Sequence, residues 1–169
     1  MLARDWTDPI FAAYKTPFPA PAQASPEALI AHVTALSAAD SKDAALKKLQ
    51  GYLWRIGYGD GTLATPLFGD VVPALRRWGA ARRLAVFSSG SVEAQSMFFS
   101  RVEVPEGEGV VNGDGEGKAR TEDLTGLFVA NYDTVSAGPK MLASSYVRIC
   151  VEMRVDADTV LFLSDNVKG

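Results

Sequence analysis

The sequence predicts an α/β fold: a parallel β-sheet covered by helices and preceded by a small helical region. Three short apolar runs, at residues 84–87, 127–130 and 160–163, have the composition of strands buried on both faces. Segments with helical spacing separate these runs. Strands that alternate with helices form right-handed βαβ units, so the three runs are expected to lie in one parallel sheet. We place a small helical cap in residues 1–66 and the α/β core in residues 67–169.

Two helices are expected in the cap region. The proline-rich run 18–22 predicts an extended connector before them. Ser25 is followed by a proline and a glutamate, which is the usual start of a helix. The second helix is expected to begin near Asp40 or Ser41. Its apolar face would consist of Leu46, Leu49 and Leu53.

The core region is expected to contain helices at residues 70–79, 92–100 and 144–153. The first of them ends at a glycine, which is a common helix stop. Cys150, the single cysteine, lies among apolar residues of the last helix and is expected to pack against its neighbours. Residues 103–123 are rich in glycine and acidic side chains and have no apolar period, which predicts a disordered surface insertion.

Composition and charge exclude several classes of protein. A net charge of −3 gives no indication of binding to nucleic acid or to an anionic membrane. A single cysteine cannot form an intramolecular disulfide, which favours a reducing compartment. No apolar run approaches the ~20 residues of a membrane span, and the residues before Trp6 lack the layout of a signal peptide. We therefore expect a soluble protein of the cytoplasm. We further expect it to be a monomer and to occur in the nucleus as well.

Hydroxyl groups follow the first apolar run. In parallel sheets, ligands bind beyond the carboxyl ends of the strands. Ser88 and Ser89 occupy that position, directly before the helix expected at residues 92–100. Hydroxyls, backbone N–H groups and a helix N-terminus together favour phosphate binding. The alternative is that Ser91 caps the helix and the other two serines are ordinary turn residues.

A lysine and an aspartate follow the second and third runs. Lys140 is expected at the start of a helix, where the helix dipole disfavours a positive charge and a bound phosphate would compensate for the cost. A solvated surface lysine is the alternative. Asp165 follows the third run after one serine, and a carboxylate at a strand end suits Mg²⁺, which prefers oxygen ligands. Its alternative is a helix cap.

The order of these groups resembles the second to fourth motifs of haloacid-dehalogenase-like phosphatases. Within that superfamily the sequence of these motifs is similar to that of the fungal enolase-phosphatase (acireductone synthase) family. The matching stretches are LQGYLW at residues 49–54, FSSGSVEAQ at 87–95, YDTVSAGPK at 132–140 and LFLSD at 161–165. The resemblance implies a haloacid-dehalogenase-like, Rossmann-like parallel sheet with a small helical cap.

The resemblance also implies roles for individual residues. Ser88 and Ser89 would hold the phosphate of a small phosphorylated substrate. Lys140 would bind the same phosphoryl group and neutralise charge during catalysis. Asp165 would bind the Mg²⁺ cofactor. The family converts 2,3-diketo-5-methylthiopentyl-1-phosphate into the acireductone 1,2-dihydroxy-3-keto-5-methylthiopentene and phosphate, a step of methionine salvage.

One motif of the family has no counterpart at its expected place. Sequences of the family open with a strand ending in Asp-x-Glu, whose aspartate attacks phosphorus. No hydrophobic strand precedes Trp6, so the resemblance implies that the first strand and the C-terminal strand are missing and that the chain alone is inactive. Asp114 and Glu116 match the motif in letters, but they lie in the glycine-rich insertion. The alternative function is a non-catalytic protein that binds a phosphorylated ligand or a partner.

Overall fold

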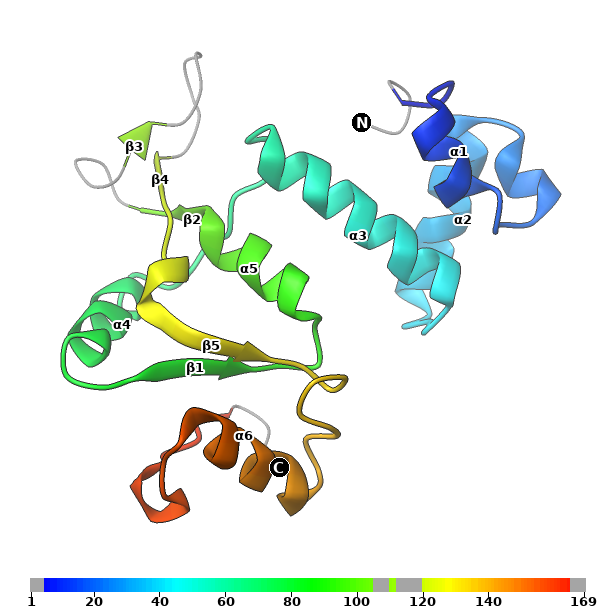
Figure 1. Cartoon of the computed structure of the whole chain (residues 1–169). Helices are drawn as coiled ribbons and strands as arrows, with labels where there is room; N and C mark the ends of the chain where they lie inside the picture. Colours follow the sequence, from blue (N-terminus) through cyan, green and yellow to red (C-terminus); the bar gives the residue numbers. More distant parts are fainter. Residues whose placement is uncertain (1–4, 105–109, 112–119, 165–169) are drawn as a thin grey trace. The chain divides into compact units, whose positions relative to one another are not determined.

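The computed structural model describes residues 5–104, 110–111 and 120–164 (Figure 1). The chain divides into two compact units, Met1–Asp60 and Gly61–Gly169. The described residues contain no helix long and apolar enough to cross a membrane.

The first unit is built from helices. They are α1 (Pro9–Lys15), the 3₁₀ helix η1 (Ala20–Gln23), α2 (Pro26–Ala38) and α3 (Ala44–Gly59). α2 begins as expected, because the Ser25 hydroxyl accepts a hydrogen bond of 3.2 Å from the N–H of Ala28. The proline-rich run is not an extended connector throughout, since η1 begins within it. Proline fits the first turn of a helix because the backbone N–H that it lacks would have no partner within the helix there.

α3 begins later than the sequence pattern predicts. Asp43, rather than Asp40 or Ser41, caps it, and the Asp43 carboxylate accepts a hydrogen bond of 2.8 Å from the N–H of Leu46. Asp40 has a φ of 48° and lies just beyond the end of α2. Aspartate tolerates this left-handed conformation better than most residues, so it suits a helix end.

The core of the first unit is apolar and largely aromatic. The rings of Tyr14 and Tyr52 lie 4.2 Å apart, and Phe11 lies 5.7 Å from Tyr52. His32 packs edge-on against Phe18 at 5.9 Å. The buried members of this core are Phe11, Phe18, Ala22, Leu29, Leu49 and Tyr52.

The second unit contains a parallel strand pair, β1 (Leu84–Phe87) and β5 (Phe128–Tyr132). Phe87 of β1 stands opposite Tyr132 of β5, so both strands end at the same edge of the sheet. The remaining helices of this unit are α4 (Val71–Gly79), α5 (Val92–Ser100), α6 (Ala143–Met153) and the 3₁₀ helices η2 (Thr125–Leu127) and η3 (Ala157–Thr159). The α/β fold with a parallel sheet is confirmed.

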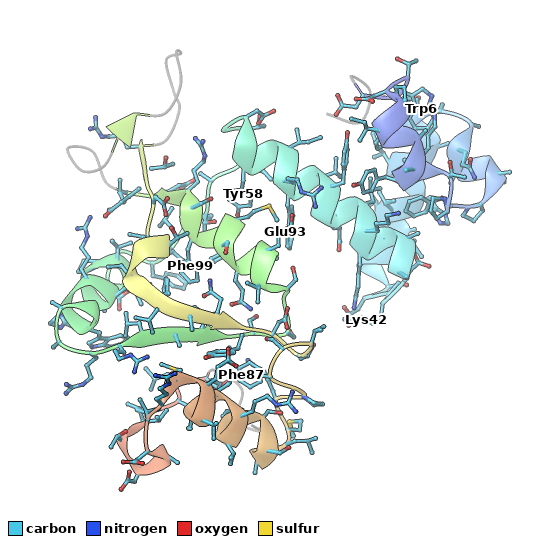
Figure 2. All side chains as sticks on the ribbon, viewed as in Figure 1. Trp6, Lys42, Tyr58, Phe87, Glu93 and Phe99 are labelled. Carbon is cyan, nitrogen blue, oxygen red and sulfur yellow. The ribbon has the colours of Figure 1, made fainter. Side chains whose placement is uncertain are left out.

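Helices α5 and α6 cover opposite faces of the strand pair (Figure 1). Phe99 of α5 lies 4.4 Å from Phe128, and Phe87 lies 5.5 Å from Tyr146 of α6, measured between ring centroids (Figure 2). Cys150 of α6 is buried and unpaired, as expected for a packing residue. Burial of the strands is incomplete, however, because Val129 of β5 remains 55% exposed.

The third apolar run does not form a strand. Residues 160–163 follow η3 without strand pairing, and Leu161 is 81% exposed. Phe162 packs against Phe87 and Tyr146, with ring centroids 6.4 and 5.2 Å away. A strand requires a neighbouring strand for its backbone hydrogen bonds. Within the described residues, β1 pairs with β5 alone, so this prediction of a third strand in the sheet is wrong.

A second, antiparallel sheet has the order β2 (Val102–Glu103), β4 (Arg120–Glu122) and β3 (Val110–Val111). Thr121 of β4 is buried, as is Val102 of β2. Within the segment 103–123, the prediction of disorder is wrong for Glu103, Val110–Val111 and Arg120–Glu122, which are paired strand residues. Val102 of β2 packs in a small core with Val72 and Leu124. The prediction of disorder for 105–109 and 112–119 lies outside the described residues, as do Asp114 and Glu116.

Candidate functional site

A tight turn connects β1 to α5. The N–H of Ser88 donates to the carbonyl of Tyr132 at 3.0 Å, one residue beyond the paired part of β1. The Ser88 hydroxyl accepts a hydrogen bond of 3.2 Å from the N–H of Gly90. Ser91 caps α5, since its hydroxyl accepts a hydrogen bond of 3.2 Å from the N–H of Ala94. Both serine hydroxyls act here as acceptors, which leaves their protons available to donate to a ligand.

Ser88 and Ser89 differ in exposure. Ser88 is half-buried and Ser89 is exposed. The alternative interpretation of Ser91 as a helix cap is confirmed, and Ser88 also has a turn-closing bond. These local bonds hold Ser88 and Ser91 on either side of Ser89, at the carboxyl end of β1, where ligands of parallel sheets bind.

Gln95 fixes this turn from inside the unit. Its side-chain amide donates to the carbonyl of Gly90 at 2.9 Å and to the carbonyl of Tyr132 at 2.8 Å. The residue is only 5% exposed. Because one amide nitrogen serves both carbonyls, the turn after β1 and the end of β5 are held together.

Asp133, the first residue after β5, joins the same two segments through its carboxylate. Oδ2 accepts a hydrogen bond of 3.1 Å from the N–H of Val92 in the first turn of α5. Oδ1 accepts from the N–H of Val135 at 3.0 Å and from the N–H and hydroxyl of Ser136 at 2.8 and 3.0 Å. These donors, first the N–H of Ser136 and then that of Val92, lower the pKa of Asp133 below its ordinary value.

Neither Asp133 nor Gln95 was singled out by the sequence pattern. Asp133 follows an apolar run directly and has a serine three residues later, which is a pattern typical of a turn closed by an aspartate side chain. That local signal could have identified its bonds to the following loop. Its bond to Val92, 41 residues earlier, has no local signature.

The loop from residue 134 to residue 140 is held by α6. The Ser145 hydroxyl, which is almost fully buried, donates to the carbonyl of Pro139 at 2.7 Å. Gly138 has a φ of 102°, and a Cβ atom at this position would lie 2.8 Å from the Ser145 hydroxyl oxygen. Both the backbone conformation and the space therefore require glycine here.

Lys140 lies at the end of this loop, before α6 begins at Ala143. It is half-buried, and its ammonium nitrogen is 5.7 Å from the ring centroids of Phe87 and Phe162. Phe87 immediately precedes Ser88 in the sequence, so the ring that the lysine contacts belongs to the last residue before the serine turn. Lys140 is outside the helix rather than in its first turn, and its charge lies within reach of a cation–π interaction with both rings.

The described residues do not form a site for the expected Mg²⁺. They contain no group of three or more His, Cys, Asp or Glu side chains that could hold a metal ion. Asp133 is at a strand end, but each of its oxygens already accepts hydrogen bonds from N–H groups. Asp165, the residue expected to bind Mg²⁺, lies outside the described residues.

Comparison with known proteins gives consistent relatives, although no protein-family model matches the sequence. The chain is 42% identical over 175 residues to "Enolase-phosphatase E1" of Chaetomium globosum, and the match covers 99% of this chain and 67% of that protein. The chain is 41% identical to the protein of the same name from Pyricularia oryzae, and the match covers 99% of this chain and 67% of that protein.

A solved structure is similar as well. The crystal structure of the UTR4 protein from Saccharomyces cerevisiae matches with a TM-score of 0.74 and 31% sequence identity, over 95% of this chain and 65% of that one. The chain thus spans about two thirds of the length of its relatives. Both curated matches extend over nearly the whole chain. On these grounds, the chain belongs to the enolase-phosphatase E1 family of haloacid-dehalogenase-like hydrolases.

Proposed function

We propose that the turn after β1 and the loop after β5 form the phosphate-binding part of an enolase-phosphatase active site. The reaction would convert 2,3-diketo-5-methylthiopentyl-1-phosphate into 1,2-dihydroxy-3-keto-5-methylthiopentene and phosphate. The observation that carries the proposal is the position of Lys140, whose ammonium lies beside Phe87 at the end of β1. A fixed positive charge next to a turn of hydroxyl and N–H groups suits a phosphate ester.

Each group has a distinct part in binding. The hydroxyls of Ser88 and Ser89 would donate hydrogen bonds to the phosphate oxygens. The Ser88 hydroxyl accepts its hydrogen bond from the N–H of Gly90 through its oxygen, which leaves its proton available to donate. The N-terminus of α5 adds a partial positive charge behind this turn. Lys140 would neutralise charge on the phosphoryl group in the ground state and in the transition state.

The rigidity of the two loops favours this arrangement. Charged groups stabilise a transition state most when they are held in place before the reaction begins. The turn after β1 is fixed by Gln95, and the loop that leads to Lys140 is fixed by Asp133 and Ser145. Lys140 therefore needs little rearrangement to reach a phosphate at the end of β1.

The proposal includes Mg²⁺, with Asp165 as its proposed ligand. When bound, the ion would withdraw charge from the phosphate oxygens. The side chains of the described part of the chain do not complete such a site. Their proposed contribution is to bind and orient the phosphoryl group.

Turnover by an extended chain tests the proposal. The chain would be joined to the flanking segments of the Chaetomium globosum relative, and phosphate release from the diketo phosphate would be measured with Mg²⁺. We expect release by the joined protein, a loss of at least ~100-fold in kcat/KM for Lys140→Met, and no change for Lys47→Met, an exposed lysine of α3.

The unextended chain is expected to release no phosphate, since none of the described strands ends directly in Asp-x-Glu. Full activity of the Lys140→Met variant would contradict the proposed role. If the joined protein binds phosphate through Lys140 but releases none from the substrate, the alternative of a non-catalytic phosphate-binding protein is favoured.

A further inference from the structure

We propose that Asp133 is a positioning residue of the phosphate site: its carboxylate holds the start of α5 and the loop to Lys140 in a fixed relation. This inference rests on the proposed function, because it names a residue that controls the geometry of that site without touching the phosphate. Asp133 is only 9% exposed.

Two separate sets of bonds meet at this carboxylate. Oδ2 accepts from the N–H of Val92, one residue beyond the Ser91 cap. Oδ1 accepts from Val135 and Ser136, in the loop that continues to Lys140. An aspartate that only closed its own turn would need one oxygen. The second oxygen ties that turn to the helix that follows the two serines.

The charge of Asp133 makes its role unusual. A carboxylate near a phosphate site repels the phosphate, so on electrostatic grounds alone Asp133 should weaken binding. Asp133 strengthens binding overall if the order that it imposes on both loops outweighs the repulsion. The two effects have opposite signs, so they can be separated by experiment.

Val92→Pro removes the bridging bond without changing any charge. Proline has no backbone N–H, and it is favoured at the first position of a helix, which Val92 occupies. The preceding residue, Ser91, has φ −59° and ψ 155°, a conformation that a following proline favours. Val92→Ala is the matched control, because it shortens the same side chain but keeps the N–H.

Asp133→Asn provides a second and independent variant. An amide has one acceptor oxygen, so it can serve the N–H of Val92 or the N–H groups of the following loop, but not both sets. Asp123→Asn is its control. Asp123 also closes a turn, with Oδ1 accepting from the N–H of Thr125 at 2.8 Å, but that turn is before β5 and does not lead to Lys140.

The test measures binding of inorganic phosphate to the 169-residue chain by calorimetry at fixed ionic strength, with urea unfolding as a check that each variant folds. We expect about tenfold weaker binding for Val92→Pro than for Val92→Ala. Asp133→Asn should also bind phosphate more weakly than Asp123→Asn. Both variants have lost one negative charge, and in Asp133→Asn the lost charge is the one near the phosphate site. Amide hydrogen exchange at Gly90 and Ser136 in the phosphate-free chain should be faster in Val92→Pro.

Equal phosphate affinity of Val92→Pro and Val92→Ala would overturn the inference. A higher phosphate affinity of Asp133→Asn than of Asp123→Asn would overturn it as well. Should Val92→Pro fail to fold, the sign of the change in Asp133→Asn decides the matter. Failure of the proposed function has a different signature: the parent chain would bind phosphate no better than its Lys140→Met variant. That result would also remove the site that Asp133 is proposed to position.

Discussion

The ammonium nitrogen of Lys140 lies 5.7 Å from the ring centroid of Phe87, the last residue of β1. The ring belongs to the strand and the lysine to the loop after β5, so this contact joins the loop that contains Lys140 to the residue that precedes Ser88. The contact is worth only about 0.5–1 kcal/mol at a partly exposed site. It orients the lysine without competing strongly with a phosphate for its charge.

Replacement of Lys140 should weaken phosphate binding. Lys140→Met keeps most of the aliphatic side chain against Phe87 but removes the charge. We expect the affinity of the chain for inorganic phosphate to fall at least about tenfold, because a charged hydrogen bond contributes about 1.5–3 kcal/mol. Calorimetric titration measures this directly. Lys47→Met, which removes an exposed lysine from α3, should leave the affinity unchanged, and equal losses in both variants would mean that only net charge matters.

Gly138→Ala should destabilise the protein and disturb the loop to Lys140. The backbone φ of 102° is unfavourable for alanine, and the added Cβ would lie 2.8 Å from the Ser145 hydroxyl oxygen. Unfavourable backbone conformations of this kind cost about 1–3 kcal/mol. Urea unfolding should show a loss in that range. Gly126→Ala is the control, because nothing lies within 4 Å of its added Cβ.

The two causes of this loss can be separated. In the double variant Gly138→Ala with Ser145→Ala, the close contact is relieved but the backbone strain remains. A double variant that is as stable as Ser145→Ala alone would contradict the argument from backbone conformation.

Stability should depend on the ionisation of Asp133. Its pKa in the folded protein lies below the ordinary value of 3.8, because backbone N–H groups, first that of Ser136 and then that of Val92, stabilise the charged form. An aspartate whose folded pKa is depressed contributes stability that is complete above its unfolded pKa and is lost as the pH falls through the folded pKa. Asp133→Asn should therefore be less stable than the parent chain at pH 7.

The difference in unfolding free energy should shrink as the pH falls below about 4, because protonated Asp133 then resembles the neutral amide. Urea unfolding of both proteins at pH 7, 5 and 3 measures it. Glu27 and Asp40, whose pKa values are also lowered, are present in both proteins and cancel from the comparison. A difference that stays constant from pH 7 to pH 3 would show that ionisation of Asp133 has no part in its effect.

Ser25→Ala tests the helix start in the first unit. The hydroxyl accepts the N–H of Ala28, and its loss leaves that N–H without its capping partner. We expect a decrease of about 1 kcal/mol in the free energy of unfolding. Ser25→Asp should retain most of the stability, because aspartate is an equally good cap. An unaffected Ser25→Ala protein would contradict the assignment of this cap.

Local patterns predicted the elements whose causes are local. α5 begins after Ser91 as expected because the cap and the helix it precedes are adjacent in sequence. β1 coincides with its apolar run. The strand expected at 160–163 is absent because strand formation depends on a neighbour, which an apolar run cannot specify. The bond between Asp133 and Val92 was missed for the same reason, since its partners lie far apart in the sequence.

The central claim is that Ser88, Ser89 and Lys140 form a phosphate site. The most direct test is to locate a bound oxyanion in a crystal. Tungstate is a tetrahedral oxyanion like phosphate, and its metal atom gives a strong anomalous signal in a crystal of the chain. We predict a tungsten peak at the carboxyl end of β1, with its oxygens within hydrogen-bond distance of the two serine hydroxyls and the Lys140 ammonium. Tungstate bound elsewhere at saturating concentration, with no peak at this turn, would contradict the account.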